Sequence, residues 1–386
     1  MNEIIYISNI DVNNSISGVT NKIKSQISVL NSNDFITVVP LLNRNKYIFK
    51  FFSRLPFISS ETNITMKKFL LSQDLNSVVA IYIRRSLIDN KFINNLKYIK
   101  NKKPKISIIL EISSYPYLEE MRRITQFPYK IKELIGLKKI SNFVDRIVTY
   151  TEHKYLFGVP CINLINGIDY KNSCKIHPIQ NSTNEMRIIA VAQLDFWHGY
   201  DRVINGIYDY YKTKKSGMLD VFFDIVGNGP EKSKLLKQVE DLNLQEFVIF
   251  HGLKFGESLD AIYNTANIAV ETLGMHRKNA ELSSSLKSRE YILKGLPFIS
   301  SAKIDVIPDN WKYFYKVSSD ESSICIKSVI DFVNGLNKSN QHRDDIINEI
   351  NSYGSDKFDI KITFKPVIEY LDSLSHNEEK FKHEIE

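Results

Sequence analysis

The chain has 386 residues, 43% of them hydrophobic and 25% charged, which fits two globular domains and excludes disorder throughout. No apolar run approaches the ~20 residues of a membrane-spanning helix, and the first residues, MNEIIYISNI, do not resemble a signal peptide, so we expect a cytoplasmic protein. The net charge of +7 is uneven, because residues 1–180 contain 26 Lys and Arg against 13 Asp and Glu, whereas the remainder contains 25 against 31.

Short β-branched runs alternate with amphipathic runs through the first half. EIIYIS, FITVVP, SVVAIYI, KISIILE and RIVTY predict strands, and residues 18–31, 88–100 and 117–139 predict helices between them. This alternation is typical of a parallel sheet covered by helices on both faces. CINLI and the turn NGIDY follow, and then a polar stretch, Asn172–Glu185, which we interpret as a linker.

The alternation restarts after the linker. RIIAVAQL, VFFDIVG, FVIFHG, NIAVETL and PFISS predict a second set of strands, and residues 318–375 look helical. We therefore expect an α/β protein with two doubly wound domains, over residues 1–175 and 185–355, followed by a C-terminal helix and frayed tail over 356–386. Ligands of such sheets bind beyond the carboxyl ends of the strands, so the residues after each strand are candidates for a site.

The first candidate segment is VAQLDFWHGYDRVI, residues 191–204. A strand ends near Ala192 and a helix begins near Gly199, with His198 and Arg202 one turn apart around its start. A helix N-terminus offers unpaired N–H groups and partial positive charge, which suits a phosphate. The alternative is a surface loop in which an aromatic side chain covers the edge of the core.

The second candidate segment is FDIVGNGPEKSKL, residues 223–235. Gly227 and Gly229 lie between a strand and a helix, and Pro230 suits the first helical turn. Glycines let a backbone approach a ligand closely, but an ordinary turn between a strand and a helix would have the same composition.

The third candidate segment spans residues 271–300 and is the most informative. A basic loop, HRK, precedes a serine cluster with N-cap candidates and a helix that holds Lys287 and Glu290 on one face. Basic groups beside a helix start fit a diphosphate, and a carboxylate one turn along fits ribose hydroxyls. The alternative is a local ion pair between Lys287 and Glu290, worth only a few tenths of a kcal/mol.

Taken in order, WHGYDR, VGNGPE, HG with an amphipathic helix, LGMHRK and SLKSREYILKGLPF resemble the nucleotide-binding domain of retaining GT-B glycosyltransferases of the group-1, or family 4, type. The resemblance covers about residues 160–300, and NGIDY resembles that family's inter-domain junction. Over residues 1–160 it is weaker, where SGVTNKIKSQ and EISSYPYLEEM look like a subgroup that builds bacterial surface polysaccharides. ITFKPVIEYL looks like the family's final helix, which packs back on the first domain.

This resemblance implies two Rossmann-like domains facing a central cleft, with the acceptor in the first and a nucleotide sugar in the second. It also implies transfer of a sugar from a nucleoside diphosphate to an acceptor hydroxyl with retention, as in capsule or exopolysaccharide synthesis, without a cofactor. The catalytic candidates are Glu111, His198, Arg202 and Lys287. The nucleotide-sugar contacts carried over are Gly18, Gly199, Gly227, Gly229, Leu253, His276, Arg277, Ser285, Leu286 and Glu290.

Three departures from the family pattern bear on these roles. Glu290 matches the second of two glutamates seven residues apart, but the first falls on Leu282. The family has an Arg and a Lys after the first strand of this domain, and these positions hold Gln193 and His198 here. Arg202, Arg277 and Lys287 therefore become the best candidates to neutralise the charge of the phosphates. The histidine of many members is matched by Glu111, which either orients a substrate or caps a turn.

Metal sites are not expected. The three cysteines show neither CxxC nor Cys/His spacing, which argues against a zinc site and a disulfide framework. No Asp-x-Asp follows a strand, so we expect basic groups to neutralise the diphosphate without a metal. In the retaining mechanism implied by the resemblance, a phosphate oxygen of the leaving group accepts the acceptor's proton, so no carboxylate pair at glycosidase spacing is expected.

The basic first half suggests an anionic partner. Residues 46–57 interleave Lys and Arg with Phe, and residues 130–140 form a basic amphipathic stretch, so we expect peripheral association with the inner face of a membrane and a glycan or lipid-diphosphate acceptor. The alternatives are a solvated basic surface and plain core packing of the phenylalanines. No nucleic-acid-binding motif is present. The rival functions are a non-catalytic partner subunit of another glycosyltransferase and a GT-B-fold sugar-nucleotide epimerase.

Overall fold

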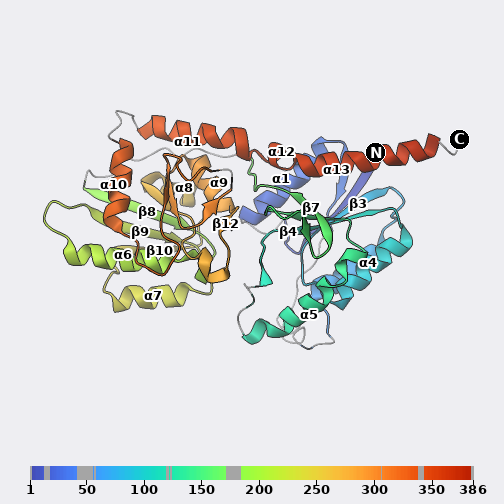
Figure 1. Cartoon of the computed structure of the whole chain (residues 1–386), viewed down its shortest axis with the longest axis horizontal. Coiled ribbons are helices and arrows are strands. Elements are labelled where there is room, and N and C mark those ends of the chain that lie inside the picture. The colour runs from blue at the N-terminus through green and yellow to red at the C-terminus, as the bar shows by residue number, and fades with distance from the viewer. Residues whose placement is uncertain are drawn as a thin grey trace. The chain divides into compact units, whose positions relative to one another are not determined.

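A computed structural model describes residues 2–12, 18–40, 55, 58–118, 121, 124–170, 184–305, 307–337 and 343–383. The chain divides into two compact units. Unit 1 comprises Met1–Gly167 and Ile360–Glu386, and unit 2 comprises Ile168–Asp359. Each unit contains a parallel sheet with helices on its faces, so the expected two-domain α/β architecture is confirmed (Figure 1). The chain passes from unit 1 to unit 2 between Gly167 and Ile168 and returns to unit 1 between Asp359 and Ile360.

The main sheet of unit 1 is parallel except at one edge. Its strand order is β2-β1-β3-β4-β5-β7-β6, and only the β6–β7 pair is antiparallel. The strands are β1 (Asn2–Ile7), β2 (Phe35–Val38), β3 (Val78–Arg84), β4 (Ser107–Ile112), β5 (Arg146–Thr149), β6 (Tyr155–Leu156) and β7 (Val159–Asn163).

Helices cover both faces of this sheet. They are α1 (Gly18–Ser32), α3 (Glu61–Ser72), α4 (Asn90–Lys102), α5 (Phe127–Leu137), α12 (Ile360–Thr363) and α13 (Lys365–His383), with short 3-10 turns η2 (Ile124–Gln126) and η3 (Ile140–Asn142). Because successive strand residues point to opposite faces, Ile81 packs in the core that contains α3 and α4, while Tyr82 packs with α1 and α13. The C-terminal helix therefore returns to the first domain, as expected.

Two local signals explain where these helices begin. Asp89 caps α4 by accepting a hydrogen bond from the backbone N–H of Phe92. The helix expected over 117–139 begins only at Phe127, because Pro128 favours the first turn of a helix and is not tolerated inside one. Helix α3 was not among the predicted elements.

Unit 2 has a six-stranded, wholly parallel sheet of order β10-β9-β8-β11-β13-β15. Its strands are β8 (Glu185–Val191), β9 (Asp220–Val226), β10 (Val248–Gly252), β11 (Ile268–Val270), β13 (Phe298–Ser300) and β15 (Phe314–Lys316), and a separate pair joins β12 (Leu282–Ser283) to β14 (Lys303–Ile304).

The helices of unit 2 also pack on both faces. One core contains side chains of α6, α7 and α10 with Ile299, while its neighbour Phe298 contacts Tyr291 of α9 on the opposite face. The helices are α6 (Tyr200–Thr213), α7 (Lys232–Asp241), α8 (Glu257–Thr265), α9 (Leu286–Lys294), α10 (Ile326–Asn337) and α11 (Arg343–Phe358), with 3-10 turns η4 (Phe196–His198) and η5 (Met275–Lys278).

Within the part of the chain that the structure describes, no helix is long and apolar enough to cross a membrane. The aromatic and basic stretch 46–57 lies outside the described residues apart from Leu55, and so does most of the expected linker. The second basic stretch, 130–140, falls on α5 and the residues that follow it.

Candidate functional site

The loops that follow β8 and β11 meet where the strands of the unit 2 sheet reach their carboxyl ends, and we call this end of the sheet its carboxyl edge. The backbone N–H of Leu273 donates to the carbonyl of His198 at 2.9 Å, and that of Gly274 donates to Trp197 at 3.1 Å. Gly199 has a φ of 66°, and a Cβ there would lie 2.8 Å from the carbonyl carbon of Leu273. Glycine is therefore required where these loops cross.

The Gly227–Gly229 turn packs just as closely on the loop after β8. A Cβ on Gly227 would lie 1.8 Å from the carbonyl oxygen of Ala192, and one on Gly229 would lie 2.3 Å from that of Leu194. The Leu194 N–H also donates to the Asn228 carbonyl at 3.0 Å. Loop packing within unit 2 thus accounts for both glycines, and their contact with a ligand stays a prediction.

His198 is a buried, neutral donor in this arrangement. Its Nδ1 accepts a hydrogen bond from the Asp195 backbone N–H at 3.1 Å, which leaves the ring proton on Nε2. Burial, with the charges of Lys287 and Lys278, lowers the pKa of His198 well below its ordinary value. His198 can therefore offer one hydrogen bond to an anion but not a positive charge.

Lys287 lies at the start of α9 and reaches back to the end of β11. Its ammonium donates to the backbone carbonyl of Glu271 at 2.7 Å and to the Thr272 hydroxyl at 2.9 Å. Burial lowers the pKa of Lys287 to about 8, against the opposing charge of Glu271. These contacts, rather than the alternative ion pair with Glu290, hold the Lys287 ammonium.

The carboxylate that balances this lysine is Glu271, which is fully buried. It accepts hydrogen bonds from the hydroxyls of Ser283 and Ser300, each at 2.9 Å. Burial alone would raise the pKa of Glu271. The charge of Lys287 and the surrounding serine hydroxyls nevertheless hold this pKa below its ordinary value. Glu271 therefore stays ionised, and its backbone carbonyl holds the ammonium of Lys287 at the sheet edge.

Lys278 is the second buried cation at this edge. Its ammonium lies 5.1 Å from the centre of the Trp197 ring, and its charge lowers the pKa of both His198 and Lys287. The sequence pointed to Lys278 only as part of the basic loop HRK, and it did not point to Glu271 or Thr272 as site residues. Their positions in the sequence could have identified them, since Glu271 directly follows a strand and Lys278 is the last residue of the basic loop HRK.

Helix α9 begins at this cluster. The Ser285 hydroxyl caps it by accepting from the Ser288 N–H at 3.2 Å, so the N–H groups of Leu286 and Lys287 lie in its first turn, where intrahelical acceptors are lacking. Glu290 lies one turn along, where burial raises its pKa and Lys294 opposes that rise.

Two predicted arginines are committed to other contacts. Arg202 is almost fully buried and donates to the carbonyls of Leu273, Ser318 and Ser322. Arg277 donates to both carboxylate oxygens of Asp201 and to Glu321, which His276 also contacts at 2.7 Å. These residues fix the loops around the site, and their contact with phosphate stays a prediction.

The remaining candidates lie at the edges of the two units. Leu253 follows β10 and is 62% exposed, so its side chain is available to a planar base. Gly18 is the first residue of α1 in unit 1. Leu282 belongs to β12, and the described residues contain no cluster of three or more His, Cys, Asp or Glu side chains that could hold a metal ion.

Glu111 in unit 1 is fully buried at the end of β4. Its Oε1 accepts hydrogen bonds from Arg84 at 2.7 Å and from the Tyr150 hydroxyl at 3.0 Å, and its Oε2 accepts from the Tyr82 hydroxyl at 2.8 Å. Burial alone would raise its pKa, but the charges of Arg84 and Lys22 hold the pKa of Glu111 at about 2. The carboxylate is thus saturated by its own unit, which favours a positioning role.

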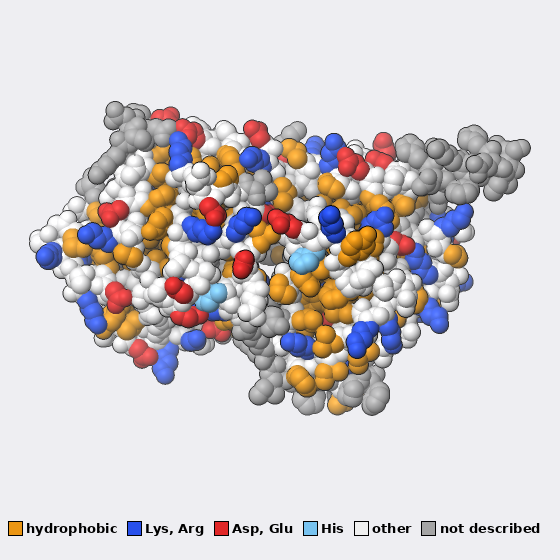
Figure 2. Space-filling view, viewed as in Figure 1, with side chains coloured by type: hydrophobic (Ala, Val, Ile, Leu, Met, Phe, Trp, Pro, Cys, Tyr) orange, Lys and Arg blue, Asp and Glu red, His pale blue; other side chains and the backbone are white. Residues whose placement is uncertain are grey.

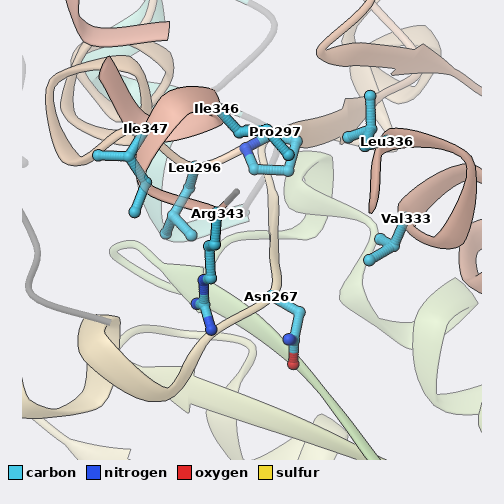
Figure 3. A pocket seen from close by; sticks show the side chains of 9 residues that line it. Asn267, Leu296, Pro297, Val333, Leu336, Arg343, Ile346 and Ile347 are labelled. Atoms are coloured by element: carbon cyan, nitrogen blue, oxygen red, sulfur yellow. The ribbon is translucent and has the colours of Figure 1, made fainter. Parts of the chain in front are cut away.

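A cavity of about 50 Å³ lies elsewhere in unit 2 (Figure 3). Asn267 and Pro297, which line it, directly precede β11 and β13, and Arg343 points into it beside Asn267. In a parallel sheet the amino ends of the strands share one edge, so this cavity lies at the edge opposite the lysine cluster and is not part of the candidate site.

No protein-family model and no curated protein matches the sequence. Solved structures match over nearly the whole chain. Sucrose-phosphate synthase from Thermosynechococcus elongatus is 13% identical with a TM-score of 0.69, over 98% of this chain and 100% of that one. An E. coli trehalose-6-phosphate structure bound with UDP-2-fluoro glucose is 11% identical with a TM-score of 0.58, over 96% and 98%. The lipopolysaccharide outer core galactosyltransferase WaaB is 13% identical with a TM-score of 0.53, over 96% and 99%. The chain therefore has the GT-B fold of these glycosyltransferases.

Proposed function

We propose that this GT-B chain is a glycosyltransferase that moves a sugar from a nucleoside diphosphate to a hydroxyl of a glycan or lipid-linked acceptor. The observation that carries the proposal is the cluster of Lys278, Lys287 and the Nε2–H of His198 at the carboxyl edge of the unit 2 sheet. Parallel α/β sheets bind ligands at this edge, and two cations beside a helix start suit a diphosphate.

The difficult step in such a transfer is the build-up of negative charge on the departing diphosphate. Donors that are already positioned stabilise this charge without reorganising during the reaction. Glu271 and Thr272 hold the Lys287 ammonium in place, and two of its three N–H groups make these contacts. The third N–H, with the first-turn N–H groups of α9, would meet the phosphate oxygens.

The nucleoside would occupy the neighbouring loops. A solved GT-B structure bound with UDP-2-fluoro glucose supports a uridine-type donor class. We assign the ribose hydroxyls to Glu290, whose carboxylate lies one turn beyond the α9 start, and the base to the exposed Leu253. The proposal includes retention of configuration, with a phosphate oxygen of the leaving group accepting the acceptor's proton. It also includes independence from metal ions, because Lys278 and Lys287 would supply the charge.

The acceptor proposal rests on α5 of unit 1, whose amphipathic pattern is inverted. Lys132 and Glu133 are buried, where Lys132 donates to the Ile58 carbonyl at 2.6 Å and Glu133 accepts from Arg85 at 3.0 Å. Large apolar side chains instead face outward, namely Phe127, Ile131, Leu134 and Ile135, which are 61%, 44%, 44% and 47% exposed.

An exposed apolar helix face flanked by lysines suits the surface of an anionic membrane. Lys138 and Lys139 follow α5 and are exposed. We therefore propose peripheral binding at the inner face of a membrane and a role in surface-polysaccharide synthesis. The match to a lipopolysaccharide galactosyltransferase supports this role.

The test is turnover of a panel of UDP-, GDP-, ADP- and dTDP-sugars by the purified chain, with products separated by chromatography. We expect release of the nucleoside diphosphate from one class of donor. A changed sugar on an intact nucleotide would instead show the epimerase. Binding of no panel member, together with no turnover, would leave the non-catalytic partner subunit, which Gln193 and Leu282 favour.

A further inference from the structure

Three aromatic rings form a small cluster beside the hairpin of β6 and β7 in unit 1. The centre of the Tyr115 ring lies 5.1 Å from that of His153 and 6.0 Å from that of Phe157, and both pairs are edge-to-face. Tyr115 follows β4, His153 follows β5, and Phe157 lies in the turn between β6 and β7. We call these three residues the aromatic shelf.

The shelf is only partly covered by the rest of the unit. Tyr115 and Phe157 are half-buried against the core, and His153 is exposed. Hydrophobic side chains also gather on the visible face of unit 1 (Figure 2). Tyr115 and His153 follow the carboxyl ends of β4 and β5, where parallel α/β sheets bind ligands, and rings that are not buried in the core are available to a ligand.

The chain holds Phe157 here in an uncommon conformation. Its φ is 51°, a left-handed value that bulky residues rarely adopt, and Gly158 follows with a φ of 78°. A turn with positive φ at both central positions favours Asn and Gly. Phenylalanine at the first of these two turn positions therefore runs against the conformational preference of the residue. Its ring lies beside that of Tyr115.

Polar groups lie in the chain segments that carry Tyr115 and His153. One guanidinium nitrogen of Arg84 donates to the Ser113 hydroxyl at 3.0 Å, two residues before Tyr115. Nδ1 of His153 lies 2.9 Å from the Thr151 hydroxyl, so Nε2 is the ring nitrogen that a ligand would meet. Asn163 donates to the carbonyl of His153 at 2.9 Å and so fixes the loop that carries the histidine.

We propose that the aromatic shelf binds a pyranose ring of the acceptor. A sugar ring has an apolar face of axial C–H groups, which packs on the electron-rich face of an aromatic ring, while its hydroxyls require donors and acceptors at the rim. Tyr115, His153 and Phe157 provide the ring surfaces, and the exposed Ser113 and His153 Nε2 provide polar groups for the hydroxyls. This inference rests on the proposed glycosyltransferase function and names the acceptor as the ligand of unit 1.

Saturation-transfer NMR with methyl glycosides tests the shelf directly. The probes are methyl β-D-glucopyranoside, methyl β-D-galactopyranoside and methyl α-D-mannopyranoside, each with the full-length protein. We expect saturation of the ring C–H protons of at least one probe. The signal should fall by at least half in His153→Ala and in Tyr115→Leu. His153 is exposed, so its removal leaves folding unaffected.

The matched control is Tyr155→Ala. Tyr155 is 66% exposed on the same hairpin but takes no part in the ring contacts, so its loss should leave the signal unchanged. The proposal that the shelf binds a sugar is contradicted if none of the three probes shows saturation of its ring protons. It is also contradicted if the signal is the same in His153→Ala and in the wild type. Calorimetric titration with UDP separates the two proposals: UDP binding without a shelf signal contradicts only the shelf, and a shelf signal without turnover of any donor contradicts the enzyme.

Discussion

The ammonium of Lys287 lies 2.7 Å from the backbone oxygen of Glu271, across the gap between a helix start and a strand end. The carboxylate of Glu271 is fully buried and shares the site with this ammonium, so the pair positions one cation at the edge of the sheet. Glu290, three residues along the same helix, lies near Lys294, and its contact with ribose stays a proposal. This relationship organises the proposed donor site.

Replacing Lys287 with alanine should weaken nucleoside-diphosphate binding. The change removes a charge-assisted hydrogen bond, worth about 1.5–3 kcal/mol, or a loss of affinity of tenfold or more. Calorimetric titration with UDP measures it. Lys234→Ala is the control for net charge, because the Lys234 side chain is 74% exposed on the same unit. Equal affinity in Lys287→Ala and wild type would remove Lys287 from the site.

The affinity for UDP should also depend on pH. Burial lowers the pKa of Lys287 to about 8, so the free protein loses this positive charge as the pH rises through that value. Binding should be nearly constant below pH 7 and weaken above pH 8, with proton uptake when UDP binds near the midpoint. Lys287→Arg keeps its charge and should abolish the weakening. A wild-type affinity that is flat from pH 6 to 9 would contradict the assignment.

Glu111→Gln should destabilise unit 1 rather than act on the donor. Removing one partner of a buried ion pair costs about 3–5 kcal/mol, because Arg84 and Lys22 lose their counter-charge. The folded-state pKa of Glu111 is about 2, below its unfolded value, so its stabilisation is present at neutral pH and is lost as the pH falls toward 2.

Urea unfolding at pH 7 and pH 3 checks this prediction. The stability difference between wild type and Glu111→Gln should be larger at pH 7 than at pH 3, with UDP affinity unchanged wherever the variant is folded. A fully stable Glu111→Gln protein that binds donor but has lost turnover would instead assign Glu111 to catalysis.

The outward apolar face of α5 predicts binding to anionic vesicles. Binding should fall as salt rises, because surface charges are screened beyond a Debye length of about 8 Å at physiological ionic strength. Ile131→Ser with Leu134→Ser should weaken sedimentation with phosphatidylglycerol vesicles, whereas Leu71→Ser, a change at another exposed leucine of unit 1, should not. Equal binding of all three proteins to neutral vesicles would leave this face without a membrane role.

Turnover of the donor should not require a divalent metal. Two lysines and the first turn of α9 would neutralise the diphosphate, so activity in EDTA should equal that without it. Complete loss in EDTA, restored by Mn²⁺ or Mg²⁺, would show that a metal ion carries this charge.

The sequence by itself determined most of the strands of the two main sheets and their order along the chain, because strands buried on both faces read as continuous apolar runs. VVAIYIR, which forms β3, is an example, and every one of its residues is buried. Short-range signals also placed Lys287 near a helix start and the cap of α9 within the serine cluster 283–285, of which the structure selects Ser285.

Only the tertiary structure decided which polar groups face a ligand and which are used by the chain itself. Arg202 and Arg277 look like phosphate ligands in sequence, yet backbone carbonyls and carboxylates far along the chain engage them. The sequence gives no role to Glu271 and names Lys278 only within the loop HRK, but the parallel sheet brings both to the Lys287 ammonium. The physical reason is that pairing of buried charges depends on distances between strand ends, which local sequence patterns do not specify.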